Sequence, residues 1–85
     1  MTVTANANMS VGERVVRGAI AAGNSPEHEG AGWFLRLMLS NGEPLKGVVS
    51  DLCITDGVLR LEPDTGDGSD IYINLEDIST AWVEF

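Results

Sequence analysis

Apolar positions in the first third of the chain recur at the spacing of one helix face, and polar positions fall opposite them. The apolar side comprises Val11, Val15, Val16, Ala19, Ile20 and Ala22. Ser10 followed by Glu13 is a capping box, in which the serine accepts a hydrogen bond from a free amide at the helix start. Gly23 is a typical helix stop. The pattern predicts a helix over about residues 11–22.

Short segments with the period-two pattern of β-strands fill the rest of the chain. They cover residues 33–40, 44–54, 58–62, 71–75 and 80–85. Asn41-Gly42 is a hairpin signal between the first and second segments, and Asp56-Gly57 is one between the second and third. Gly47 inside a strand indicates a bend or a close approach of another backbone. The predicted fold is mainly β: an N-terminal α-helix followed by a strongly bent five-stranded antiparallel small barrel.

The chain of 85 residues suits one domain. Residues 1–9 are small and polar and are expected to be a flexible arm, with the domain over 10–85. The single cysteine, Cys53, excludes an internal disulfide and fits a reducing compartment. No apolar run approaches the length of a membrane span, and the first residues lack the pattern of a secretory signal. We therefore expect a cytoplasmic protein that does not contact a membrane.

The net charge of −8 is unevenly distributed. Acidic and basic residues balance over 1–50, whereas 51–85 carries many acids and only one base, Arg60. An acidic surface repels phosphate backbones at long range. Nucleic acid would therefore have to bind locally, on the bases of the N-terminal half or by base stacking.

Two segments resemble the Sm-like family of small barrels. The stretch LMLSNGEPLKGVV is similar to the first Sm motif, in which Asn-Gly precedes a leucine and then a glycine, here Leu45 and Gly47. The stretch ISTAWV, residues 78–83, is similar to the final strand of Hfq, the bacterial branch. The resemblance covers about residues 10–85. It implies a divergent bacterial or phage member of the family.

The resemblance also implies self-assembly. Sm-like proteins form rings in which the fourth strand of one subunit pairs with the fifth strand of the next, so a homo-oligomeric ring of about five to seven subunits is expected. The residues expected at or beneath this seam are Ile71, Ile73, Val83 and Phe85. The alternative is that they fill the core of the single subunit.

The family implies RNA binding in the pore of the ring, and here the sequence departs from the pattern. Many Sm proteins carry an aromatic-Asp pair and a Met-Asn pair in the loop region after the second strand. The corresponding positions are Leu52-Cys53 and Asp56-Gly57, which lack base-stacking and base-reading groups.

A second departure precedes the final strand. Where the family supplies Arg-Gly or Lys-His, this chain has Leu75-Glu76-Asp77. A glutamate at the lip of the pore would repeat around a ring as a circle of negative charge, which repels phosphate. RNA is therefore not expected to bind in the pore.

The remaining candidates for nucleic-acid contact lie elsewhere. Arg14 and Arg17 share the polar side of the helix and could contact phosphates; the alternative is ordinary solubility, with Glu13 close enough to neutralise them. Trp33 is in phase with the leucines of its strand, so it is expected in the core. Trp82 is out of phase with its neighbours and is expected to face outward or to contact another subunit, with base stacking as the alternative.

The sequence offers little for metal or cofactor chemistry. Glu27-His28-Glu29 has ligand atoms at an unsuitable spacing, and residues 64–70 fail the pattern of a calcium loop. Cys53 follows an apolar residue and is expected to be a buried hydrophobe. We therefore expect no enzyme, metal or cofactor.

These observations lead to two hypotheses for function. The first is an Sm-like, ring-forming, non-enzymatic RNA-binding scaffold that contacts phosphates through Arg14 and Arg17. The alternative is an acidic protein-interaction ring that binds a basic protein and excludes nucleic acid.

Overall fold

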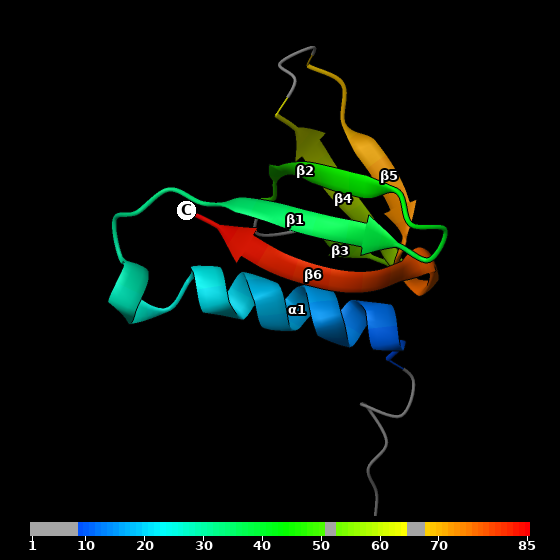
Figure 1. Ribbon diagram of the computed structural model, residues 1–85, viewed down its shortest axis with the longest axis horizontal. Helices are drawn as coiled ribbons and strands as arrows, with labels where there is room; N and C mark the ends of the chain where they lie inside the picture. The colour runs from blue at the N-terminus through cyan, green and yellow to red at the C-terminus, as the bar shows by residue number, and fades with distance from the viewer. Residues whose placement is uncertain (1–8, 51–52, 65–67) are drawn as a thin grey trace, which may run out of the picture.

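The computed structural model describes residues 9–50, 53–64 and 68–85 (Figure 1). The predicted arm over residues 1–9 lies almost entirely outside these ranges. The elements are α1 (Val11–Gly23), a 3₁₀ turn (Pro26–His28), β1 (Phe34–Leu39), β2 (Pro44–Val48), β3 (Ile54–Thr55), β4 (Val58–Pro63), β5 (Ile71–Asn74), a second 3₁₀ turn, η3 (Leu75–Asp77), and β6 (Ile78–Glu84). In the described parts of the chain, no helix is long and apolar enough to cross a membrane.

The helix α1 begins as the capping pattern predicts. The Ser10 Oγ accepts a hydrogen bond of 3.1 Å from the backbone N–H of Glu13. The Glu13 carboxylate pairs with Arg17 at 2.8 Å. Along the apolar side, Val16 and Ala19 are buried. Val11 is 63% exposed and Ala22 is also exposed, so these two positions of the predicted apolar side do not pack on the core; in the first turn the buried position is Gly12.

Glycines let α1 pack closely at both ends. A Cβ at Gly12 would collide with the backbone carbonyl of Leu75, so the helix start lies directly against η3. A Cβ at Gly23 would lie 2.5 Å from the Trp33 ring, so the helix end lies against the indole. The tryptophan is half-buried and packs against the core, as its phase predicts.

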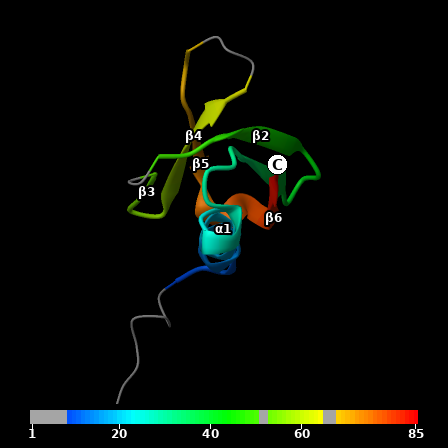
Figure 2. The same cartoon turned by 90° about the vertical axis from the view of Figure 1, so that its left-hand side faces the viewer.

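The strands form one curled antiparallel sheet, and α1 lies across its open side (Figures 1 and 2). β1 pairs with β2 and with β6, while β4 pairs with β2, β3 and β5. The strand order is β3-β4-β2-β1-β6, with β5 on the other side of β4, so β5, β6 and the two-residue strand β3 each have one described partner strand. This half-barrel with an N-terminal helix confirms the predicted fold class.

The second predicted strand differs in detail. Its residues form two short strands, β2 and β3, which both pair with β4. Gly47 lies where β2 crosses β4, and a Cβ there would collide with the Glu62 carbonyl, which confirms the predicted close backbone approach. The hairpin at Asp56 and Gly57 is also confirmed, with φ of 52° and 80° at these residues.

The core lies between α1 and the concave face of the sheet. Leu35 and Leu37 of β1 and Leu59 of β4 have no exposed surface. The other buried apolar residues are Val16, Ala19, Cys53, Leu61, Ile73, Leu75 and Ile78. Within the described ranges no polar or charged residue is buried, so polar chemistry is confined to the surface and its hollows.

Candidate functional site

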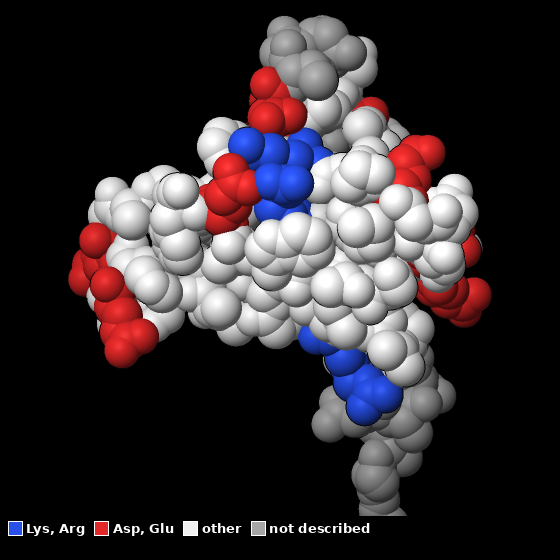
Figure 3. Space-filling model, viewed as in Figure 1, with Lys and Arg blue, Asp and Glu red and all other residues white. Residues whose placement is uncertain are grey.

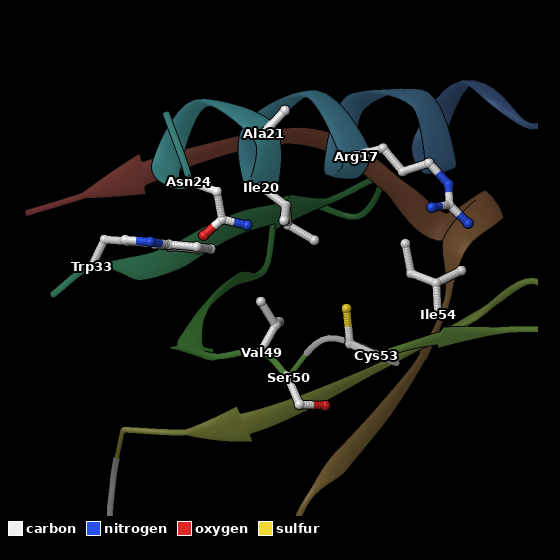
Figure 4. A pocket seen from close by; sticks show the side chains of 9 residues that line it. All are labelled: Arg17, Ile20, Ala21, Asn24, Trp33, Val49, Ser50, Cys53 and Ile54. Carbon is white, nitrogen blue, oxygen red and sulfur yellow. The ribbon is translucent and has the colours of Figure 1, made fainter. Parts of the chain in front are cut away.

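A cleft of about 440 Å³ lies between α1 and the segment that joins β2 to β3. We call it the α1 cleft. Its described lining residues are Arg17, Ile20, Ala21, Asn24, Trp33, Val49, Ser50, Cys53 and Ile54. Figure 4 shows Trp33 at one end of the cleft and the Arg17 guanidinium at the other, near Ile54. The cleft has the size of a small-molecule site, and its lining mixes apolar side chains with polar groups.

The sequence reasoning did not find this cleft. Arg17 was recognised for its charge, and Trp33 was placed in the core. No sequence pattern indicates that Asn24 or Ser50 lines a cleft. Asn24 follows the predicted helix, and Ser50 lies within the predicted strand over residues 44–54. The break between β2 and β3 exposes this hollow beside α1.

A second hollow, of about 290 Å³, brings together the positions that match the family's pore motif. We call it the acidic hollow. Its described lining residues are Ser10, Glu13, Asp56, Gly57, Val58, Asn74, Leu75 and Glu76. The Leu75 N–H donates to the Gly57 carbonyl at 2.9 Å, which joins the β3–β4 hairpin to η3. Among these described residues three are carboxylates and none is a base.

Within the acidic hollow, Leu75 is buried and belongs to the core, whereas Glu76 is exposed. The Glu76 N–H donates to the Asn74 Oδ1 at 3.0 Å, so the side chain of Asn74 caps the 3₁₀ turn. Cys53 is buried outside this hollow, on the wall of the α1 cleft, and Leu52 lies outside the described residues. The structure thus brings together four of the positions that the sequence resemblance matches to the Sm pore motif, namely Asp56, Gly57, Leu75 and Glu76, and separates Cys53 from them.

The two helix arginines differ in their contacts. The Arg17 Nε donates to the Glu13 carboxylate, one helical turn earlier, in an exposed ion pair. Arg14 is exposed, and no acidic partner is found for it among the described residues. In Figure 3, basic side chains form a group over the N-terminal half of α1. Glu13 therefore neutralises the charge of Arg17, as one alternative expected, and does not pair with Arg14.

The basic residues of the strands are held in ion pairs on the outer face of the sheet. Glu84 of β6 receives hydrogen bonds from Arg36 of β1 and from Lys46 of β2, the latter at 3.1 Å. Lys46 also lies 3.6 Å from the Asp64 carboxylate. Figure 3 shows these basic and acidic side chains side by side over β1 and β2. We call this group the outer ion-pair network.

The charge of Glu84 depends on this network. The hydrogen bonds from Lys46 and then from Arg36 hold the pKa of Glu84 below its ordinary value. Both donors favour the ionised carboxylate, because each bond is made to the charged form. The network therefore uses cations that would otherwise be available to phosphate.

Trp82 lies on the outer face, as its phase predicts, and is 40% exposed. It is paired with Arg36 across β1 and β6, and the guanidinium carbon lies 5.7 Å from the centre of its ring. This cation–π contact occupies part of the aromatic surface. Trp82 is therefore on a different face from the α1 cleft.

The residues expected at a subunit seam have different environments. Ile73 is buried in the core, and Ile71 and Val83 are half-buried against it. Phe85 is 59% exposed, and its ring centre lies 4.3 Å from that of His28. Sequence reasoning missed Tyr72, which is 68% exposed on edge strand β5. The alternation of β5 places it opposite Ile71 and Ile73, a signal that could have identified it.

The weaker candidates contribute no site. The His28 Nδ1 lies 3.2 Å from the Ala22 carbonyl, and His28 belongs to the short turn after α1. Residues 65–67, in the loop tested against a calcium pattern, lie outside the described residues. Over the described ranges no group of His, Cys, Asp and Glu is placed to hold a metal ion.

Comparisons with known proteins do not narrow these assignments. No protein-family model, no curated protein and no solved structure matches this chain.

Proposed function

We propose that this protein is a subunit of an Sm-like ring, a non-enzymatic scaffold that binds RNA on its helix-bearing face. The observation that carries the proposal is that β5 and β6 each lack a second partner strand. β5 is paired only with β4, and β6 only with β1, over the residues described. An edge strand is a template for another strand, so β5 of one subunit and β6 of the next have a physical reason to pair.

This contact is heterologous, because two different edges meet. Repetition of a heterologous contact closes into a ring when the rotation between subunits allows it. Tyr72 on β5 and Phe85 beyond β6 supply exposed aromatic surface near the two edges. Their burial at the seam would stabilise the assembly. The family resemblance supports about five to seven subunits.

The RNA contact is assigned to the polar side of α1. Arg14 and Arg17 lie outside the outer ion-pair network, whose cations are held by Glu84 and Asp64. One pair of arginines binds phosphate weakly, whereas a ring repeats the pair once per subunit and so multiplies the contact. The acidic hollow makes the pore positions unsuitable for phosphate.

The acidic hollow itself favours a second candidate function, a ring that binds a basic protein segment. Glu13, Asp56 and Glu76 contribute carboxylates to one concavity, and a ring would repeat them around its axis. Such a surface attracts Lys- and Arg-rich peptide and repels nucleic acid. The two functions use different residues, since RNA is assigned to Arg14 and Arg17 and the basic segment to the acidic hollow, so they can be separated by experiment.

The first test is the solution mass by light scattering, at low and at high salt, with and without short oligouridine or oligoadenine. A discrete multimer that gains mass with RNA at low salt is the expected result. The gain should disappear in a variant with both R14Q and R17Q, because these arginines are the proposed phosphate contacts. K46Q serves as a control that removes one positive charge from the outer ion-pair network, where no RNA contact is proposed.

A discrete multimer that ignores both RNAs would overturn the RNA scaffold and favour the acidic protein-interaction ring. A monomer under every condition would overturn the ring. Retention of RNA by the R14Q and R17Q variant, with its loss in K46Q, would move the contact to the outer face of the sheet.

A further inference from the structure

The indole of Trp33 gives the α1 cleft an aromatic surface that is held in place by packing. The Trp33 indole lies against Gly23, where a Cβ would be 2.5 Å from the ring, so the glycine backbone supports the indole and fixes its position. The indole faces a cleft whose other walls include Ile20, Val49 and Ile54 (Figure 4). A slot that presents an indole held in place suits a planar aromatic group, because stacking there requires little ordering of the protein.

A polar group lies at the margin of this slot. Asn24, just after the helix, carries an amide that both donates and accepts, which suits the edge of a nucleobase. Ser50 contributes to the wall of the cleft, but its Oγ accepts from Arg60 at 3.0 Å and points away from the slot (Figure 4). The hydrogen-bonding group at the margin of the slot is therefore the Asn24 amide.

Arg17 supplies charge at the end of the cleft away from Trp33 (Figure 4). Its ion pair with Glu13 uses the Nε, and a guanidinium has further N–H donors on its terminal nitrogens. These donors suit a phosphate, which arginine can bind in a bidentate manner. An aromatic support at one end and a guanidinium at the other match a ligand with a ring and an anionic group.

We propose that the α1 cleft of each subunit binds one nucleotide, with the base against Trp33, its edge at Asn24 and its phosphate at Arg17. The volume of about 440 Å³ falls in the usual range for small-ligand sites. The nucleotide is either a free nucleoside monophosphate or one unit of a single strand. The second source rests on the proposed RNA scaffold, whereas the first requires only the folded subunit.

The test measures binding of AMP and UMP to the full chain by titration calorimetry. Binding of oligoadenylate and oligouridylate, which carry the same bases, is then measured in the same way. The expected result is saturable binding of one mononucleotide per chain. R17Q should weaken it about tenfold, because a charge-assisted contact to phosphate is lost. N24A should weaken it about threefold to tenfold, because a neutral hydrogen bond is lost. K46Q, outside the cleft, should bind as the unaltered chain does.

The outcomes separate this inference from the proposed function. Binding of AMP or UMP that depends on Arg17 and Asn24 supports the cleft even if the protein is a monomer and ignores RNA. Tighter binding of the oligonucleotide than of the mononucleotide identifies a strand as the source, and equal binding identifies the free nucleotide. No heat with either mononucleotide at millimolar concentration overturns the inference, as does binding that R17Q and N24A leave unchanged while the folded state is intact by circular dichroism.

Discussion

Gly12 and Gly18 lie on the same helix, yet their surroundings differ. Gly12 is buried against the Leu75 carbonyl, whereas a Cβ at Gly18 would meet no atom within 4 Å. Glycine is unfavourable in a helix interior by up to about 1 kcal/mol relative to alanine. The glycine at position 12 therefore allows close packing, and the one at position 18 has no packing reason.

This difference predicts opposite effects of the same substitution. G18A should raise the free energy of unfolding by up to about 1 kcal/mol, through helix propensity alone. G12A should lower it by about 1–3 kcal/mol, because the new methyl group forces α1 away from η3. Urea unfolding of the two variants measures both. Equal effects of the two substitutions would contradict the close approach of α1 to Leu75.

The outer ion-pair network predicts that the free energy of unfolding depends on pH through Glu84. Its pKa is lowered from the ordinary value of 4.5 by hydrogen bonds from Lys46 and Arg36. The unfolded state then binds the proton more readily than the folded state. The stabilisation is therefore fully present above the ordinary pKa and is lost as the pH falls through the lower folded value.

The corresponding measurement is urea unfolding of the unaltered chain and of E84Q at neutral pH and at several acidic values. The unaltered chain should be more stable at neutral pH, and the two should converge only as the pH falls through the lowered pKa of Glu84 in the folded state. A constant difference across the range would show that Glu84 acts by packing and not by charge.

The edge strands β5 and β6 are the elements on which the proposed assembly depends. Y72K places a lysine on the exposed side of β5, and edge lysines oppose strand addition. We expect this variant to fold normally, since Tyr72 is 68% exposed, and to lose the multimer. Light scattering together with circular dichroism checks both points.

V48K is the matched control for Y72K. Val48 is 42% exposed, and it lies on β2, which has partners on both sides. The control should keep the mass of the unaltered chain. Dissociation in V48K with an intact ring in Y72K would place the seam on the face of the sheet and not at its edge.

The sequence predicted best those elements that local chemistry determines. Ser10 marks the helix start, and the glycines at 42 and 57 adopt positive φ in the turns where the pattern places them. The α1 cleft could not be predicted, since it forms where the chain leaves the sheet between β2 and β3. The meeting of Glu13 with Asp56 and Glu76 depends on how α1 docks, which no local pattern encodes.

At the scale of the whole molecule, the distribution of charge decides which partners can approach. The cations of the strands are held by acids, the helix bears Arg14 without a described acidic partner, and the acidic hollow bears carboxylates. The acidic hollow is thus one place where the net charge of −8 is concentrated.

Replacing the negative charge of Glu76 by a positive one should create a binding site for RNA. E76K would place a cation at the lip of the proposed pore, repeated in every subunit. Oligouridine should then bind more tightly, and the slope of log affinity against log salt should steepen by about 0.7 for each phosphate neutralised. Fluorescence anisotropy over a salt series measures both. An unchanged slope would show that residue 76 does not line a shared pore.

The pairing of β1 with β6 has a consequence for the speed of folding. The outer ion-pair network joins residues as far as 48 positions apart, from Arg36 to Glu84, and the strands that carry them lie side by side. The hairpins at residues 42 and 57 close short loops, whereas the pairing of β1 with β6 closes a long one. Contacts so distant in sequence slow folding. On the ribosome, α1 would therefore remain without most of its packing surface until β6 has been synthesised.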